Sequence, residues 1–266
     1  MAGGEIWRAG DAYEQYVGRW SRLVARDFLD WLDPAAGQSW LDVGCGTGAL
    51  SAAIIERCSP TLLTGIDPSA GFLATARARI ADPRARFEQG DAQALPLAGG
   101  AFDVAVSGLV VNFVGNPGAM LGEMRRVLRP GGTVALYVWD YAGKMQLMRH
   151  FWDAAAALDP AARELDEGVR FPICRPGALA ALFRDAGLEA VATAPIDVPT
   201  VFRDFEDYWT PFLGGQGPAP GYCVSLPDER RLALRERLRA ALPVGADGRI
   251  TLSARAFAVR GTVPGP

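Results

Sequence analysis

Lysine and histidine are almost missing from this 266-residue chain, which has Lys144 as its single lysine and His150 as its single histidine. The lysine is not set in the phosphate-binding loop G-x-x-x-x-G-K-[ST], so that motif is excluded. Schiff-base chemistry would have to use this one amine. A lone histidine cannot by itself anchor a metal site or a Ser-His-Asp triad. We therefore expect no metal and a His150 that is packed or lies on a helix surface.

Paired cysteines and an excess of positive charge are also lacking. The cysteines, Cys45, Cys58, Cys174 and Cys223, form no C-x-x-C pair, which argues against a zinc ribbon and against a dithiol redox motif. We expect reduced thiols in a reducing compartment. The formal net charge of −3 argues against a broad surface that neutralises phosphates, so we expect no nucleic-acid substrate.

No uninterrupted apolar segment reaches the roughly 18 residues that a membrane-spanning helix needs. The opening residues, Met1 to Glu5, show no basic stretch followed by an apolar run, which is the pattern of a secretory signal. Hydrophobic residues nevertheless make up 50% of the chain, enough for a large core. These features predict a soluble, cytoplasmic, single-domain protein.

Hydrophobic periodicity divides the first half of the chain into alternating helices and strands. A helix or helix pair is expected over 11–32. Strands are expected over 39–43, 62–66, 85–89, 102–107 and 133–139, and helices over 49–58, 70–80 and 117–128. This alternation predicts an α/β fold in which helices cover both faces of a parallel sheet.

The second half of the chain is less regular. Residues 140–174 are helical in pattern but interrupted, and a helix over 176–186 is expected to end at Gly187. A strand over 188–198 and an ordered but irregular segment over 202–222 follow. An amphipathic helix over 228–242 and a closing strand over 249–263 complete the prediction.

Three loops after successive strands carry residues suited to a nucleoside. Residues 41–48 read LDVGCGTG, so alternating glycines follow the first strand, where they allow a tight turn and the close approach of a ligand. Asp67 ends the second strand, where a carboxylate accepts hydrogen bonds from ribose hydroxyls. Asp91 follows the third strand, where it would meet the amine of adenine. We expect the three loops to converge on one ligand.

With these motifs, residues 41–139 resemble the cofactor domain of class I S-adenosylmethionine-dependent methyltransferases, in the small-molecule branch that includes enzymes of ubiquinone and menaquinone biosynthesis. The matching segments are 41–48 (LDVGCGTG), 65–69 (GIDPS), 90–96 (GDAQALP), 102–104 (FDV) and 128–132 (LRPGG). The resemblance implies a Rossmann-like, seven-stranded, mostly parallel sheet whose last strand is antiparallel. It also implies a cofactor core over 38–139 and a small helical cap from 1–37, 140–175 and 199–248.

The resemblance further implies S-adenosyl-L-methionine as cofactor and S-adenosyl-L-homocysteine as product. Gly44 and Gly46 would receive the methionine part, Asp67 the ribose, and Asp91 with Ala92 the adenine. The implied cofactor-binding residues in and after the first four strands of the core are Asp42, Gly44, Cys45, Gly46, Asp67, Pro68, Asp91, Ala92, Ser107 and Leu109, the last two lying near the sulfur.

Two N-terminal residues have two possible roles. Related enzymes often fold an N-terminal helix over the cofactor, so Tyr16 and Arg19 would reach its carboxylate, Arg19 through a charge-assisted bond. The alternative is a packed tyrosine and a surface arginine, and the sequence leaves both open.

The implied reaction is in-line transfer of a methyl group to a small-molecule acceptor. The leaving group departs neutral, so acid–base residues are optional. Asp140, His150 and Asn112 are candidates to help an acceptor lose a proton. Residues 107–113 lack the tetrad [DN]-P-P-[YF], which argues against methylation of adenine or cytosine. The sequence does not identify the acceptor.

Two other functions fit parts of the pattern. Residues 44–49 also satisfy the G-x-G-x-x-[GA] motif of NAD-dependent oxidoreductases, although the chain has no Tyr-x-x-x-Lys pair. A protein that binds S-adenosylmethionine without turnover would carry the same motifs as the enzyme.

Overall fold

The computed structural model describes residues 14–215 and 217–265, which divide into two compact units. The first, which we call the sheet unit, comprises Ser21–Val138, Ile173–Ile196 and residues 256–265. The second, the helical unit, comprises the described residues up to Trp20, then Trp139–Pro172 and Asp197–Arg255. The division of the sequence into a core and cap segments stays a prediction.

One seven-stranded sheet runs in the order β3-β2-β1-β4-β5-β7-β6. Its strands are β1 (Ser39–Val43), β2 (Leu62–Asp67), β3 (Ala85–Gln89), β4 (Phe102–Gly108), β5 (Leu128–Trp139), β6 (Glu189–Phe202) and β7 (Ile250–Thr262). The pairs β1·β2, β2·β3, β1·β4 and β4·β5 are parallel, as alternating strands and helices predict. Strand β1 lies at the centre and is buried along its whole length.

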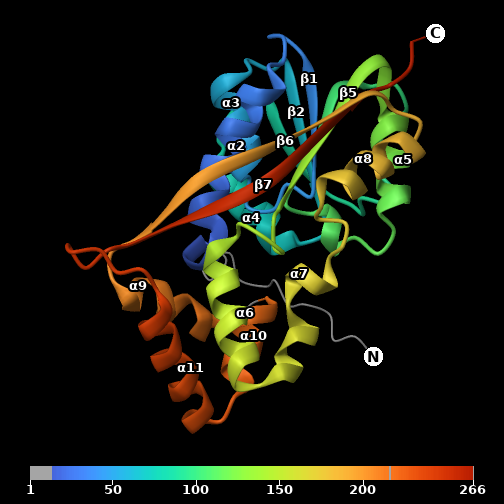
Figure 1. Ribbon diagram of the computed structural model, residues 1–266. Coiled ribbons are helices and arrows are strands. Elements are labelled where there is room, and N and C mark those ends of the chain that lie inside the picture. Colours follow the sequence, from blue (N-terminus) through green and yellow to red (C-terminus); the bar gives the residue numbers. More distant parts are fainter. Residues whose placement is uncertain (1–13, 216, 266) are drawn as a thin grey trace. The chain divides into compact units, whose positions relative to one another are not determined.

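The helices of the sheet unit lie on both faces of these strands. They are α2 (Arg19–Leu32), α3 (Ala49–Arg57), α4 (Ala70–Arg79), α5 (Pro117–Val127) and α8 (Pro176–Asp185), with the short 3-10 helix η2 (Val111–Phe113). Figure 1 shows α2 and α3 on one side of the strands and α5 and α8 on the other. The π-helix η1 (Glu14–Gly18) precedes α2, which confirms the predicted helix pair from Glu14 onward, while 11–13 lie outside the described residues.

The last strand is antiparallel, as predicted. The Arg255 side chain of β7 pairs with Asp197 of β6, and the Thr262 hydroxyl of β7 donates to the Glu189 carbonyl of β6. Residue numbers rise along β7 while those of its partners fall, so the two strands are antiparallel. On its other side, the Val263 amide donates to Gly132 and the Val263 carbonyl accepts from Gly131.

This second pairing corrects the predicted start of the fifth strand. We expected a turn through Gly131 and Gly132 and a strand from residue 133, but β5 begins at Leu128. Gly131 does adopt the left-handed backbone typical of turns, with φ of +77°. Its amide is nevertheless bonded to Val263, so the strand continues through the irregularity.

The helical unit contains more regular structure than predicted. Its elements are α6 (Gln146–Leu158), η3 (Pro160–Leu165), α7 (Glu167–Arg170), α9 (Phe205–Trp209), η4 (Thr210–Gly214), α10 (Pro218–Ser225) and α11 (Asp228–Ala241). The expectation of an irregular segment over 202–222 was wrong. Asp204 caps α9 and Pro218 opens α10, but each helix is too short to show a periodic pattern.

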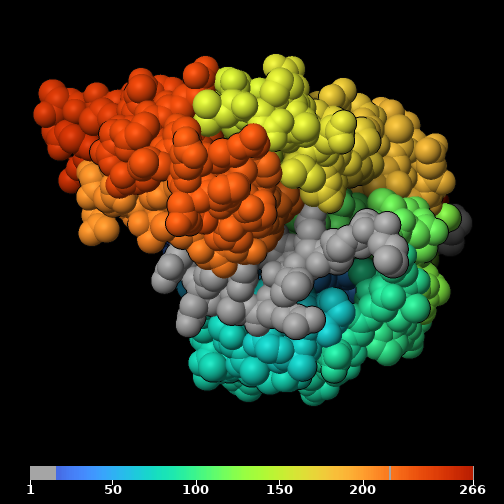
Figure 2. All heavy atoms as spheres, turned by 90° about the horizontal axis from the view of Figure 1, so that it is seen from below, coloured from blue at the N-terminus to red at the C-terminus, as the bar shows by residue number. Residues whose placement is uncertain are grey.

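Aromatic side chains form the core of the helical unit. Phe151 stacks on Phe212 with ring centroids 4.5 Å apart, and Tyr208 and Tyr16 contact Phe212 at 5.4 and 5.5 Å. In Figure 2 the yellow surface of α6 and α7 adjoins the orange surface of α10. Among the residues described, no helix combines the length and hydrophobicity needed to cross a membrane.

Strand β1 contains a buried acid. Asp42 is 1% exposed, and its Oδ2 accepts a hydrogen bond of 2.7 Å from the Ser51 hydroxyl of α3. Its Oδ1 has no hydrogen-bond partner among the residues described. Burial raises the pKa of Asp42 to about 7, because the charged form loses its hydration.

This shift predicts how stability depends on pH. The folded pKa exceeds the unfolded value of about 3.9, so the native state favours the proton and loses stability as pH rises from about 4 to 7, by up to about 4 kcal/mol. We expect Asp42→Asn to remove this loss, so that its free energy of unfolding relative to the wild type increases between pH 5 and pH 8. Urea denaturation at both pH values measures it.

Asp82→Asn is the control. The Asp82 pKa is lowered to about 2 by the hydrogen bond from Arg84, so this carboxylate is ionised in both states throughout that pH range. Parallel pH profiles for Asp42→Asn and the wild type would contradict a raised Asp42 pKa.

Candidate functional site

In the turn after β1, glycine residues leave main-chain atoms accessible at the edge of the sheet. Gly44 and Gly46 adopt left-handed φ angles of +74° and +54°. A Cβ at Gly44 would come within 2.6 Å of Val110, whereas a Cβ at Gly46 would meet no atom within 4 Å. Gly44 is therefore needed for packing, and Gly46 faces open space that a ligand can approach. The amides of Gly44 and Cys45 both donate to the Ile66 carbonyl, at 2.7 and 3.1 Å, which ties the turn to β2.

Asp67 joins this turn to the end of β2. Its Oδ2 accepts from the Gly46 amide at 2.9 Å and its Oδ1 from the Ser69 amide at 2.8 Å. The residue is 7% exposed, and burial raises the pKa of the carboxyl while the two amide bonds oppose the rise. Each carboxylate oxygen has more than one acceptor position, so both can still receive a ligand hydroxyl.

The loop after β3 lies beside Asp67. The Gly90 amide donates to the Asp67 carbonyl at 3.2 Å, and the Gln89 side chain donates to the Pro68 carbonyl at 2.9 Å. Asp91 is exposed, and its Oδ1 accepts from the Gln93 amide at 2.9 Å, which lowers the pKa of this carboxyl. The three predicted loops therefore meet at one edge of the sheet.

The end of β4 closes the same edge. The Ser107 hydroxyl is buried and donates to the Val43 carbonyl at 2.7 Å. Leu109 adopts a left-handed φ of +64°, rare for a branched residue, and its amide donates to Tyr137 at 2.8 Å. The side-chain oxygen and nitrogen of Asn112 are buried with no hydrogen-bond partner among the described residues. The Cys45 thiol is also buried, which raises its pKa.

The remaining predicted residues belong to the helical unit. Tyr16 is 2% exposed, and its hydroxyl has no hydrogen-bond partner in the part of the chain described. Burial raises its pKa well above the usual value. Arg19 donates to Asp207 at 3.1 Å and stacks on Trp20 and Phe202. Sequence reasoning missed the partner Asp207, because the two residues lie 188 positions apart and share no local motif.

The two candidate acid–base residues of this unit have different surroundings. Asp140 is 8% exposed, and its Oδ2 accepts from the Lys144 amide at 2.9 Å, so it organises the turn after β5. His150 is half-buried, and burial lowers its pKa while Asp153 opposes the shift. Among the residues described, no group of three or more histidine, cysteine or acidic side chains could hold a metal ion.

Comparison with known proteins gives the family. Residues 41–136 match the family "Methyltransferase domain". The ubiquinone/menaquinone biosynthesis C-methyltransferase of Roseobacter denitrificans is 40% identical over 118 residues, 42% of this chain and 47% of that protein. The malonyl-[acyl-carrier protein] O-methyltransferase of Pectobacterium atrosepticum is 30% identical over 169 residues, 64% of each chain. The matches thus span about half to two thirds of the length of these relatives.

A solved structure shares the fold. The Haemonchus contortus phosphoethanolamine N-methyltransferase 2, in complex with S-adenosyl-L-methionine, superimposes with a TM-score of 0.58 at 15% identity, covering 96% of this chain and 56% of that one. The three loops, the sheet order and the sequence matches agree: residues 41–136 form a class I S-adenosylmethionine-dependent methyltransferase domain.

Proposed function

We propose that this chain transfers a methyl group from S-adenosylmethionine to a small-molecule acceptor. The observation that carries the proposal is the meeting of three loops at one sheet edge, through the Gly46 amide on the Asp67 carboxylate and the Gly90 amide on the Asp67 carbonyl. The names of the two relatives support an acceptor from small-molecule metabolism, since one acts in ubiquinone/menaquinone biosynthesis and the other on a malonyl group.

The residues present fit the adenosyl and methionine groups. The open space beside Gly46 admits a ligand, and the unpaired Oδ1 of Asp42 is a buried acceptor in the strand before the turn. We assign Gly44, Gly46 and Cys45 with Asp42 to the methionine part. The other assigned residues are Asp67 and Pro68 for the ribose, Asp91 and Ala92 for the adenine, Ser107 and Leu109 near the sulfur, and Tyr16 toward the carboxylate. Arg19 is bound to Asp207 and is not assigned to the cofactor.

The bound cofactor supplies an electrophilic methyl group whose leaving group departs neutral. The chain therefore has to hold the acceptor atom in line with that group and away from water. His150, with its lowered pKa, is neutral at pH 7 and can take a proton. An Asn112 amide can only hydrogen-bond the acceptor, and Asp140 is already bonded to the Lys144 amide. A cytoplasmic location is consistent with the buried free cysteines.

A ligand comparison tests the proposal. We expect S-adenosylhomocysteine at 100 times its dissociation constant to stabilise the protein by about 2.7 kcal/mol, and NAD at the same concentration to give no shift. Thermal unfolding followed by circular dichroism measures both. Stabilisation by NAD alone would contradict the methyltransferase proposal and indicate an NAD-dependent oxidoreductase. Tight cofactor binding without methyl transfer to any of a diverse set of acceptors would indicate a sensor.

A pair of glycine substitutions tests the position of the cofactor. Gly46 and Gly100 both have left-handed φ angles, +54° and +68°, and open space at the Cβ position. Gly100 lies at the far end of the loop after β3, just before β4 begins, where its amide donates to the Arg126 carbonyl at 3.1 Å. We expect Gly46→Ala and Gly100→Ala each to cost about 1 kcal/mol of stability. Only Gly46→Ala should weaken S-adenosylhomocysteine binding, roughly 10-fold or more, because its methyl group occupies the space of the ligand.

Isothermal titration calorimetry with S-adenosylhomocysteine measures the affinity of the two variants. Equal affinities for Gly46→Ala and Gly100→Ala would contradict the assignment of the methionine part of the cofactor to this turn.

A further inference from the structure

The Arg19 guanidinium is held in one orientation inside the helical unit. Its Nη1 donates to the two Asp207 oxygens at 3.1 and 3.3 Å. Its Cζ lies 4.3 Å from the ring centroid of Trp20 and 4.8 Å from that of Phe202. The ion pair fixes the rotation of the group and the two rings restrict its position. The remaining nitrogen atoms therefore have a defined direction.

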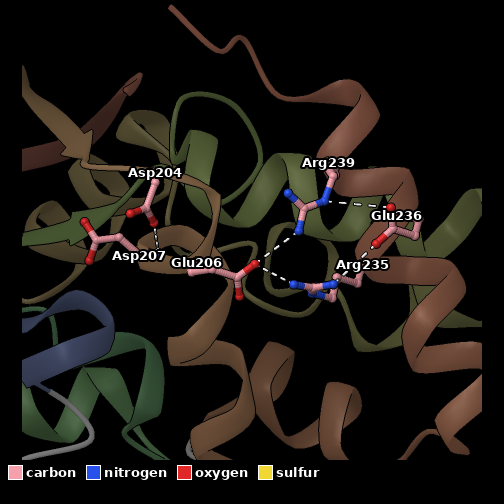
Figure 3. A network of polar contacts seen from close by, with 6 residues as sticks. All are labelled: Asp204, Glu206, Asp207, Arg235, Glu236 and Arg239. Atoms are coloured by element: carbon pink, nitrogen blue, oxygen red, sulfur yellow. Dashed lines mark hydrogen bonds and ion pairs between the residues drawn. The ribbon is translucent and has the colours of Figure 1, made fainter. Parts of the chain in front are cut away.

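Asp207 is itself fixed by contacts that do not involve Arg19. Its Oδ2 accepts from the Arg203 amide at 3.0 Å, and its own amide donates to the Asp204 carboxylate at 2.8 Å. Figure 3 shows Asp204 beside Asp207, and Glu206, the residue before Asp207, reaching Arg235 and Arg239 of α11. Helix α9 is thus tied to α11, and Asp207 is a rigid anchor for Arg19.

The other edge of the guanidinium has no partner. The Nε and Nη2 atoms of Arg19 are buried, and neither has a hydrogen bond to any residue described. The Nε1 of Trp20, whose ring stacks on this guanidinium, is buried and unpaired as well. Buried donors without acceptors are unfavourable, so these three, which find no acceptor among the described residues, favour an acceptor supplied by a ligand.

The geometry of the free edge selects the ligand. Nε and Nη2 form a planar two-donor edge that matches the two oxygens of a carboxylate. The unpaired groups at this edge are all donors, whereas the ammonium beside the carboxylate of the cofactor would need acceptors. The flanking rings of Trp20 and Phe202 suit a flat or apolar body.

From these contacts we propose that the Nε–Nη2 edge of Arg19 binds the carboxylate of a small organic acid, at a site within the helical unit. This binding site is additional to the proposed function and does not depend on it. The methionine part of the cofactor also carries a carboxylate, so the experiment separates the two sources.

The test uses the full chain and pairs of probes that differ only in the charged group. Benzoate, phenylacetate, malonate and trans-aconitate, each beside its carboxamide, are titrated calorimetrically with and without saturating S-adenosylhomocysteine. We expect at least one acid to bind the wild type roughly 10- to 100-fold more tightly than its amide, and Arg19→Gln to abolish this preference. The proposal fails if no acid is preferred or if Arg19→Gln keeps the preference.

Arg203→Gln is the matched control. Arg203 also approaches Asp207, at 3.9 Å, but its side chain is 82% exposed, so its loss should leave the preference for the acid unchanged. Loss of the preference in this control would show that it depends on overall positive charge and not on the Arg19 edge, and would overturn the proposal. If Arg19→Gln does not fold by circular dichroism, Arg19→Lys keeps the charge but lacks the two-donor edge, and the same loss is expected.

A second titration separates the two carboxylates. S-adenosylhomocysteine and methylthioadenosine share the adenosyl group, but only the first has the amino-acid part. We expect the ratio of their two dissociation constants in Arg19→Gln to stay within about 2-fold of the wild-type ratio. A 10-fold fall would assign Arg19 to the cofactor and overturn the assignment to a separate organic acid. A wild type that binds acids but neither nucleoside would contradict the proposed function and leave the carboxylate site standing.

Discussion

The hydrogen bond from the Gly46 amide to the Asp67 carboxylate is the constraint on which the candidate site depends. It spans 2.9 Å and joins the turn after β1 to the end of β2. The bond requires a backbone at Gly46 that few side chains tolerate, and a buried acid whose raised pKa is opposed by the amide bonds from Gly46 and Ser69. Both features form the site before any ligand binds. Each lowers the stability of the folded chain to some extent, because one needs a left-handed backbone and the other a buried acid.

Further bonds extend this constraint across four strands. The Gly90 amide connects the loop after β3 to Asp67, and the Ser107 hydroxyl connects the end of β4 to Val43 at the end of β1. Because these contacts exist without a ligand, the loops need little ordering on binding. A preorganised edge keeps more of the interaction energy for affinity. The buried Asp42 in the same central strand shows that polar groups at this edge are retained against their cost in burial.

The sequence predicted those parts of the molecule that depend on neighbouring residues. Strands β1 and β3 have the predicted bounds, since proline and glycine turn signals lie on both sides of each. The start of β5 was wrong because Gly131 and Gly132 signal a turn locally, while the pairing that makes them a strand comes from Val263. The loops of the site were also predictable from neighbouring residues, since Gly46, Asp67 and Asp91 each lie within three residues of the end of a predicted strand. The pair of Arg19 and Asp207 has no local signature, because the fold alone brings the two residues together.

The two units differ in the hydrogen bonds that they leave unmade, and this difference bears on what each can bind. At the loops of the sheet unit the unpaired side-chain groups, among the residues described, include Oδ1 of Asp42 and both the oxygen and the nitrogen of Asn112. The Asp67 carboxylate accepts from the Gly46 amide and has further acceptor positions. Such a mixture suits the hydroxyls and amines of a nucleoside. Around Arg19 the unpaired groups are the N–H donors of Arg19 and Trp20, and donors of this kind suit an anion. The two units therefore favour ligands of different chemistry.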